Sequence, residues 1–200
     1  QSGSSIKPLS VYGPAFEVGA ITPATVIKDL PVYYEEGQGW PKNDSRQYQY
    51  ARTVYQGIVS SVNTISVRTL DKVGYDYAYS FAKYNLGLSN LTDNYVTASG
   101  QVKSDIGQSP LALGALTVGA TVQEMATAYA TFANDGEFRE SRLFTKVYDS
   151  DGNLVLDNEQ KSEQILGEKT VTYMNVCLYD AVNSGTGKEA RVSGQYVYGK

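Results

Sequence analysis

The first ten residues hold two side chains that could do chemistry together. Ser4 and Lys7 are three positions apart, and Pro8 follows Lys7 directly. In a helix, positions i and i+3 share one face, so this hydroxyl and this ammonium group can meet. A serine beside a potential base is a candidate nucleophile, and at a helix N-terminus it also lies in the positive end of the helix dipole. The pair is therefore a candidate for nucleophilic catalysis.

A second pair with the same spacing, Ser80 and Lys83, shows that the pattern needs support from its context. Ser-x-x-Lys is expected by chance about once in 200 residues of average composition. Ser80 and Lys83 fall in the middle of a helix predicted over about 75–84, with no loop nearby. We interpret this second pair as solvated helix surface.

Two absences narrow the chemistry. The chain has no histidine, which excludes a Ser-His-Asp triad and a histidine zinc site. Its one cysteine, Cys177, excludes an internal disulfide and a Cys-x-x-Cys metal site, and its apolar helical neighbours favour a buried thiol. No metal or other cofactor is indicated. The base for any acyl chemistry must then be a lysine or a carboxylate.

The composition describes one folded domain. The 200 residues are 42% hydrophobic and 19% charged, which is typical of a globular chain. A net charge of −4 without runs of lysine or arginine argues against nucleic acid as a partner. No apolar run approaches the roughly 18 residues of a membrane span, and the N-terminus is no signal peptide. The 17 tyrosines are dispersed, so we interpret them as packing residues.

The elements that would position these residues are mostly helical. The Ser4–Lys7 pair opens a helix predicted to run to about Val18, with Gly19 as its stop. Residues 31–46 are predicted to be a long irregular connection, either functional or a surface crossing. We expect further helices over about 50–60, 64–73, 75–84, 121–134 and 169–182, a short strand over 25–30, a β-hairpin over 143–156, and the start of a strand over 195–198.

The clearest local signal is a capping box at Thr121 and Glu124, which opens the helix predicted through about Asn134. The apolar residues of this helix follow helical spacing, so we expect that face to be core. They are Val122, Met125, Ala126, Tyr129 and Phe132.

At this point the residues resemble a known family. Residues 3–8 (Gly-Ser-Ser-Ile-Lys-Pro) look like the active-serine helix of a penicillin-binding protein transpeptidase domain. Ser61-Val62-Asn63 is the only Ser-x-Asn sequence in the chain and resembles the family's second motif. Residues 183–187 and then Gly199-Lys200 resemble the approach to the third motif, Lys-Thr-Gly. Residues 112–114 and 124–136 resemble the bifunctional, class A branch.

The resemblance implies the α+β fold of serine β-lactamases and penicillin-binding transpeptidases, represented here mainly by its helical part with a truncated sheet. We expect residues 1–200 to be one incomplete transpeptidase domain with no second domain. The sequence runs from the active-serine motif to the lysine of the third motif, so we predict that Thr-Gly-Thr or Thr-Gly-Ser follows Lys200 in the parent gene.

The resemblance also implies roles for the site residues. Ser4 would attack the D-Ala-D-Ala bond of a peptidoglycan stem peptide and form an acyl-enzyme, with Lys7 as its base. A free lysine has a pKa of about 10.4, and burial together with the charge of Lys200 would lower it. Ser61 would carry a proton between Lys7 and Lys200, Asn63 would hold the substrate amide, and Lys200 would attract the terminal carboxylate. The oxyanion hole would use the Ser4 N–H and one donor from a strand outside this sequence.

The partners implied are stem peptides and β-lactam antibiotics, at the outer face of the bacterial cytoplasmic membrane, where the parent would be anchored. A further possibility is strand exchange with another copy, and the truncated chain would be poorly active or inactive. Two other readings stay open at this stage. One is a serine β-lactamase or D,D-carboxypeptidase, and the other is a β-lactam-binding sensor or structural module without turnover.

Overall fold

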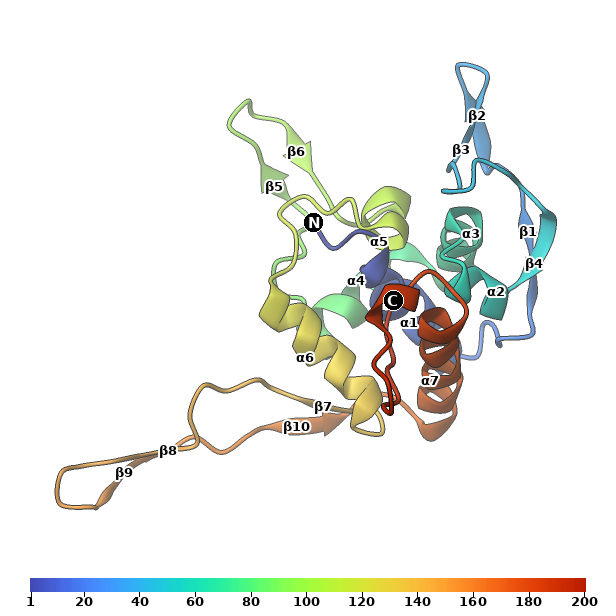
Figure 1. The fold of residues 1–200 in the computed structure, drawn as a ribbon. Coiled ribbons are helices and arrows are strands. Elements are labelled where there is room, and N and C mark those ends of the chain that lie inside the picture. Colours follow the sequence, from blue (N-terminus) through green and yellow to red (C-terminus); the bar gives the residue numbers. More distant parts are fainter.

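The computed structural model describes residues 1–200. A helical run from Gly3 to Glu17 lies at the centre of the molecule (Figure 1). The run starts as a 3₁₀ turn (η1, Gly3–Ile6), widens to a π turn (η2, Pro8–Tyr12) and ends as an α-helix (α1, Gly13–Glu17). Pro14 has no N–H, and its ring would clash with the carbonyl four residues earlier, which accounts for the wide turn before it. The helix predicted from Ser4 to Val18 is confirmed, and Gly19 ends it at a φ of +71°.

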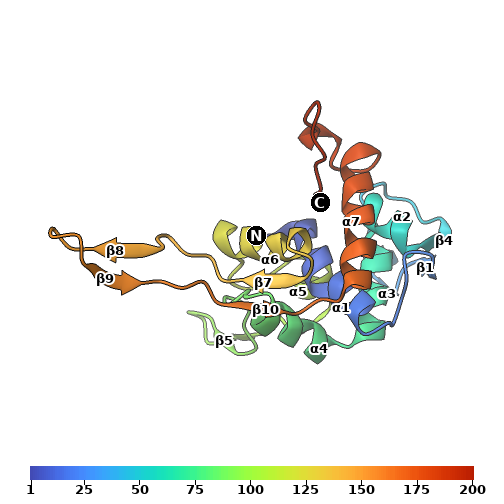
Figure 2. The same cartoon turned by 90° about the horizontal axis from the view of Figure 1, so that it is seen from below.

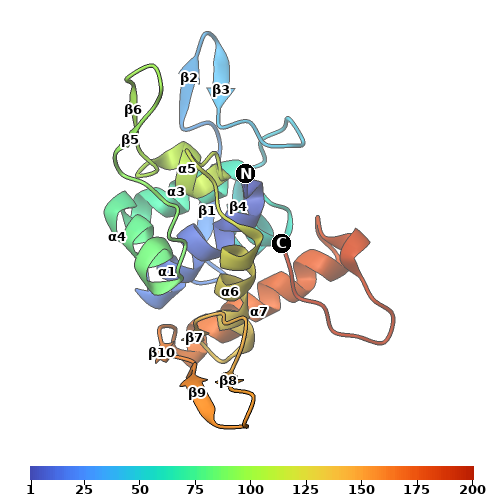
Figure 3. The ribbon, with the colours of Figure 1, turned by 90° about the vertical axis from the view of Figure 1, so that its left-hand side faces the viewer.

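Other helices surround this run on several sides (Figures 1 and 3). Their side chains and those of the central run form a core of 31 buried apolar residues, which includes Ile6, Leu9, Tyr12, Leu70 and Met174. The surrounding helices are α2 (Val54–Val59), α3 (Asn63–Val73), α4 (Tyr75–Ser80), η3 (Phe81–Asn85), α5 (Gln108–Leu113), α6 (Val122–Ala133), α7 (Glu168–Asn183) and η4 (Lys188–Ala190).

The strands form five separate antiparallel pairs, so the fold is α+β as predicted. The pairs are β1 (Val26–Asp29) with β4 (Tyr50–Thr53), β2 (Tyr33–Glu35) with β3 (Gln38–Trp40), β5 (Tyr95–Val96) with β6 (Val102–Lys103), β7 (Glu137–Arg139) with β10 (Ser162–Gln164), and β8 (Lys146–Tyr148) with β9 (Leu154–Asp157). The strand predicted over 25–30 and the hairpin predicted over 143–156 are confirmed.

Three predicted elements were wrong. Residues 50–53 form β4 rather than the first turn of a helix, because they pair with β1; the helix starts only after Thr53, whose side chain belongs to a capping box with Gln56. The connection 31–46 contains the β2–β3 hairpin. Residues 195–198 form no strand, because they have no strand beside them. The Tyr196 and Tyr198 rings pack against Tyr179 of α7, and the Gly199 N–H donates to the Leu178 carbonyl.

The capping box that opens α6 is confirmed, but its buried face is partly wrong. Phe132 is buried, whereas Val122 is 87% exposed and Ala126 is also exposed. Ala128 and Thr131 are buried instead. The buried positions lie in the second half of the helix, so the first turn of α6 is left at the surface.

Residues 139–164 form an arm that projects away from the helices (Figure 2). The end of β7 and its partner β10 form the base of the arm, and β8 and β9 form its outer part. None of its residues is buried, and it exposes apolar side chains such as Leu143, before β8, and Val155 in β9. The arm therefore adds nothing to the core.

Cys177 is fully buried on α7, as predicted, and burial raises the pKa of its thiol to about 12. No helix in the structure combines the length and the apolar character that crossing a lipid bilayer requires.

Candidate active site

A cleft of about 700 Å³ with entirely polar lining opens beside the first turn of η1. Four of the five predicted site residues line it: Ser4, Ser61, Asn63 and Lys200. The fifth, Lys7, lies beneath and is bonded to two of them. The other lining residues are Ser2, Ser5, Lys42, Asn43, Asp44, Arg46, Ser60 and Thr186.

The local backbone of η1 sets the relation between Ser4 and Lys7. Side chains at i and i+3 eclipse one another in a 3₁₀ turn, which puts Ser4 and Lys7 on one side of the helical run. Lys7 is completely buried, whereas Ser4 is half-buried at the cleft wall. The three hydrogen bonds of the Lys7 ammonium all go to the second motif and none to Ser4. The Ser4 hydroxyl is thus not tied to Lys7.

The second motif surrounds the Lys7 amine. Lys7 Nζ donates to Asn63 Oδ1 at 2.5 Å, to the Ser61 carbonyl at 3.1 Å and to Ser61 Oγ at 3.5 Å. Ser61 lies in the short connection between α2 and α3 and has a φ of +57°. A residue other than glycine rarely adopts this left-handed conformation, and such strain tends to occur at functional sites. The strained turn points both its carbonyl and its hydroxyl at Lys7.

The Asn63 amide is held at both ends. Its Oδ1 accepts from Lys7, and its Nδ2 donates to the Lys42 carbonyl at 2.8 Å. Asn63 is also the first residue of α3, so its backbone position is fixed by the helix start.

Burial shifts the pKa values of both lysines. Burial, followed by the nearby charge of Lys200, lowers the pKa of Lys7 to about 7. Burial also lowers the pKa of Lys200 to about 8. Near neutral pH a large share of Lys7 is therefore the neutral amine, which can accept a proton.

Three contacts from other elements hold the turn that carries Ser4. Gly114, at the end of α5, has a φ of +76°, and a Cβ there would lie 2.1 Å from the Gly3 carbonyl oxygen. Tyr129 of α6 donates its hydroxyl to the Ser5 carbonyl at 2.7 Å. One turn later, Ser10 Oγ donates to the Leu111 carbonyl at 2.6 Å. The position of the serine therefore depends on α5 and α6.

The other Ser-x-x-Lys pair has a structural role. Lys83 is half-buried, and its ammonium donates to the Leu91 carbonyl at 2.7 Å and to the Tyr79 hydroxyl at 3.1 Å. The prediction of a solvated surface was wrong for this lysine, which fastens the following loop to η3. Neither Ser80 nor Lys83 lines the cleft.

Sequence reasoning missed the residues that the loop after β3 brings to the cleft. Lys42, Asn43, Asp44 and Arg46 all line it. The only signal was the length of the 31–46 connection. Thr186, in the turn after α7, also lines the cleft, and its N–H donates to the Val59 carbonyl. The chain has no cluster of three or more His, Cys, Asp or Glu side chains arranged to hold a metal ion.

The whole chain, residues 1–200, matches the family model described as the penicillin binding protein transpeptidase domain. The chain belongs to this family. Penicillin-binding protein 4 of Bacillus subtilis is 33% identical over 100% of the chain, and penicillin-binding protein 1A of Clostridium acetobutylicum is 29% identical over 99% of it. The chain spans 30% and 24% of the length of these two relatives.

Solved structures show the same fold. The D,D-transpeptidase domain of a peptidoglycan glycosyltransferase from Eggerthella lenta superposes with a TM-score of 0.77 at 20% identity, over 99% of this chain and 52% of that one. Penicillin-binding protein A from M. tuberculosis, as a ceftriaxone acyl-enzyme, gives 0.75 at 18% identity, over 98% and 45%. The predicted family and fold are thus confirmed.

Proposed function

We propose that this chain carries the nucleophile and the proton-handling groups of a D,D-transpeptidase that cross-links peptidoglycan stem peptides. The main support is the Lys7 amine, which is buried beneath the cleft with a pKa of about 7 and bonded to Ser61 and Asn63. A buried lysine of this kind supplies a base in a chain without histidine.

In the proposed reaction Ser4 Oγ attacks the carbonyl of the D-Ala-D-Ala bond, and neutral Lys7 takes the hydroxyl proton. The tetrahedral intermediate then collapses. The C–N bond breaks, and the departing amine of D-alanine receives a proton through Ser61, which is 3.5 Å from Lys7 Nζ. An amine from a second stem peptide attacks the resulting ester, releases Ser4 and forms the cross-link.

The cleft offers groups for both ends of the substrate. We assign the terminal carboxylate to Lys200 and the acyl-side amide to Asn63, because both side chains line the cleft beside Ser4. The Ser4 N–H would be one oxyanion donor. A second donor is assigned by family resemblance to a strand outside these residues, and loss of one such donor typically slows turnover by about 100- to 1,000-fold.

The domain organisation and the location of the whole protein are also proposals, since the chain spans less than a third of the length of the relatives named above. We propose that residues 1–200 are part of a single transpeptidase domain, built on their continuous core, in a parent at the outer face of the cytoplasmic membrane. Residues 195–200, which have no strand partner in the chain, would be the segment for strand exchange between copies.

The test is intact mass after incubation with benzylpenicillin, for the chain itself, Ser4→Ala and the matched control Ser80→Ala. We expect one slowly formed penicilloyl adduct on the chain and on Ser80→Ala, and none on Ser4→Ala. An adduct that persists in Ser4→Ala would refute the assignment of the nucleophile. Rapid loss of the adduct to water would favour a β-lactamase, and a stable adduct that is never transferred to amine acceptors would favour a sensor.

A further inference from the structure

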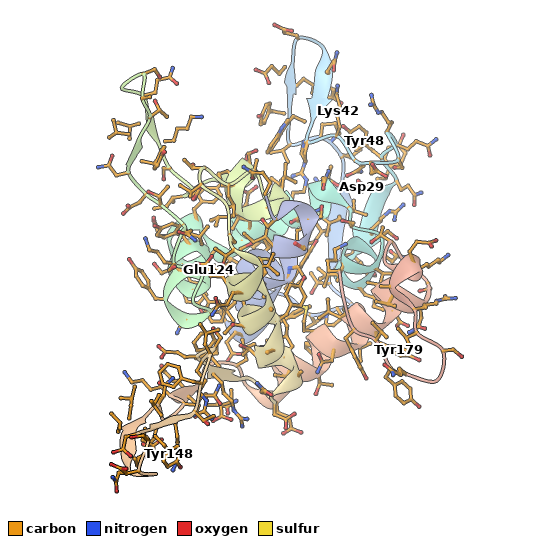
Figure 4. The ribbon with its side chains drawn as sticks, turned by 60° about the vertical axis from the view of Figure 1, so that its left-hand side comes forward. Asp29, Lys42, Tyr48, Glu124, Tyr148 and Tyr179 are labelled. Atoms are coloured by element: carbon orange, nitrogen blue, oxygen red, sulfur yellow. The ribbon has the colours of Figure 1, made fainter.

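We infer that Asn43, oriented by Asp29, is a positioning residue that fixes the Asn63 amide against the Lys7 amine. The inference rests on the role of Lys7 proposed above. Asn43 belongs to the loop after β3, and Asp29 ends β1, so neither residue is part of the sequence motifs (Figure 4 labels Asp29 and the neighbouring Lys42).

Both the oxygen and the nitrogen of the Asn43 amide are hydrogen-bonded. Its Oδ1 accepts from the backbone N–H groups of Asn63 at 3.0 Å and Thr64 at 3.3 Å. Its Nδ2 donates to Asp29 Oδ1 at 2.7 Å and to the Gln47 carbonyl at 3.0 Å. Asn43 is 6% exposed, so water cannot readily replace these bonds.

These contacts supply a helix cap from a distant segment. The residue before α3 is Val62, whose side chain cannot accept a hydrogen bond, and the first N–H groups of a helix have no partner within it. Asn43 provides the acceptor that an N-cap side chain normally provides. These bonds fix the position of the start of α3, and with it Asn63, relative to the loop that lines the cleft.

Asp29 determines which way round the Asn43 amide lies. The Asp29 carboxylate is 1% exposed and also accepts from Thr64 Oγ1 at 2.6 Å and from the Gln49 N–H at 2.9 Å, and it faces Arg52 Nε at 3.4 Å. An ionised carboxylate only accepts hydrogen bonds, so Asn43 must turn its NH₂ toward Asp29 and its oxygen toward α3.

The orientation of the Asn63 amide toward Lys7 is fixed in the same way. The Lys42 carbonyl, next to Asn43, accepts from Asn63 Nδ2, which leaves Asn63 Oδ1 facing Lys7 Nζ. An ordered series of hydrogen bonds thus runs from Asp29 through Asn43 and Asn63 to the base. A small displacement of a reacting group can cost about 100-fold in rate, so this series would act on the chemistry as well as on folding.

The first experiment measures the pKa of Lys7 by NMR titration of its ¹³Cε signal in the 200-residue chain, which needs no acylation. Burial is the main cause of the lowered pKa, so loosening Asn63 in Asn43→Ala should admit water and move the pKa from about 7 toward the ordinary lysine value. The control Thr53→Ala removes the cap of α2 and touches no cleft residue, so it should lower the melting temperature and leave the pKa of Lys7 unchanged.

Asp29→Asn is the second variant, and it decides the matter if Asn43→Ala does not fold. Loss of a negative charge alone would lower the pKa of Lys7, whereas loss of the amide orientation should raise it. A pKa of Lys7 that does not rise above the wild-type value in the folded variant would overturn the inference, because the loss of amide orientation would then have no effect on the base.

The second experiment is a double-mutant cycle on the rate constant of acylation by benzylpenicillin. Asn43→Ala should slow acylation by about 10- to 100-fold in the wild-type chain, and by less than about threefold when Asn63 is already alanine. Independent, multiplicative effects would overturn the inference. A wild-type chain that forms no Ser4 adduct would instead count against the proposed function, and the NMR result would still decide the positioning.

Discussion

Lys7 is the residue on which the proposed chemistry depends, and its burial sets the pH at which that chemistry can run. In the proposed reaction the neutral amine is the base, and burial lowers the pKa of Lys7 to about 7. We predict that the rate constant of acylation by benzylpenicillin rises with pH around a midpoint near 7. A rate series from pH 5 to 9 measures it, with Lys7→Arg as the control that stays protonated and should not be acylated. A rate independent of pH across this range would exclude Lys7 as the base.

At the residue scale, the site residues that lie within short sequence patterns were predictable. Ser4 with Lys7, and Ser61 with Asn63, could be found from spacing and family resemblance. Asn43 could not, because its partners Asp29 and Thr64 are 14 and 21 positions away along the chain. Only the fold brings β1, the loop and α3 together.

At the scale of elements, α5 holds the turn of Ser4, the proposed nucleophile, in place through a close backbone approach. Gly114 has a positive φ, and a Cβ there would overlap the Gly3 carbonyl. We predict that Gly114→Ala lowers the free energy of unfolding by about 2 kcal/mol or more and slows acylation, because the serine turn must move. The matched control is Gly152→Ala, which has a similar φ of +84° and nothing within 4 Å. It should lose only the smaller amount that the backbone conformation costs, with acylation unchanged. Chemical denaturation and acylation rates measure both variants, and equal losses would contradict the prediction.

Elements were predictable where the signal is local. The capping box of α6 and the glycine that ends the helix of Ser4 gave correct helix boundaries. Residues 50–53 and 195–198 gave wrong ones, because a strand is defined by its neighbour: 50–53 has β1 beside it, whereas 195–198 has no strand partner. Helical spacing also failed at the first turn of α6. This turn has the periodicity of a buried face, but few residues of the rest of the molecule pack against it.

For the whole molecule, the buried Lys7 and the partly buried Lys200 make stability depend on pH. The folded pKa of Lys7 is about 7 against 10.5 for a free side chain, so between these values the unfolded chain binds more protons. Stability should therefore rise with pH through this window, and Lys200 adds to it from about 8 upward. For Lys7 alone the effect is on the order of 4 kcal/mol. Urea unfolding of the chain and of Lys7→Met between pH 6.5 and 10 tests this, and an equally steep rise in Lys7→Met would contradict it.

The arm, residues 139–164, should contribute little to the stability of the fold, because none of its residues is buried. In Figure 4, Tyr148 marks its far end, well away from the helices. We predict that replacing residues 142–159 by a short turn changes the melting temperature by less than about 3 °C and leaves acylation unchanged. Calorimetry and the penicillin assay measure the two effects. A large loss of stability would show that the arm supports the core.

The burial of Cys177 makes the chain convenient for site-specific labelling. A fully buried thiol with a pKa of about 12 has almost no thiolate at neutral pH, and maleimide or iodoacetamide reagents react with the thiolate. A cysteine introduced at Ser150, at the tip of the arm, would then be the one reactive thiol without removal of the native residue. A fluorophore attached there could report on the arm while the cleft keeps its natural sequence.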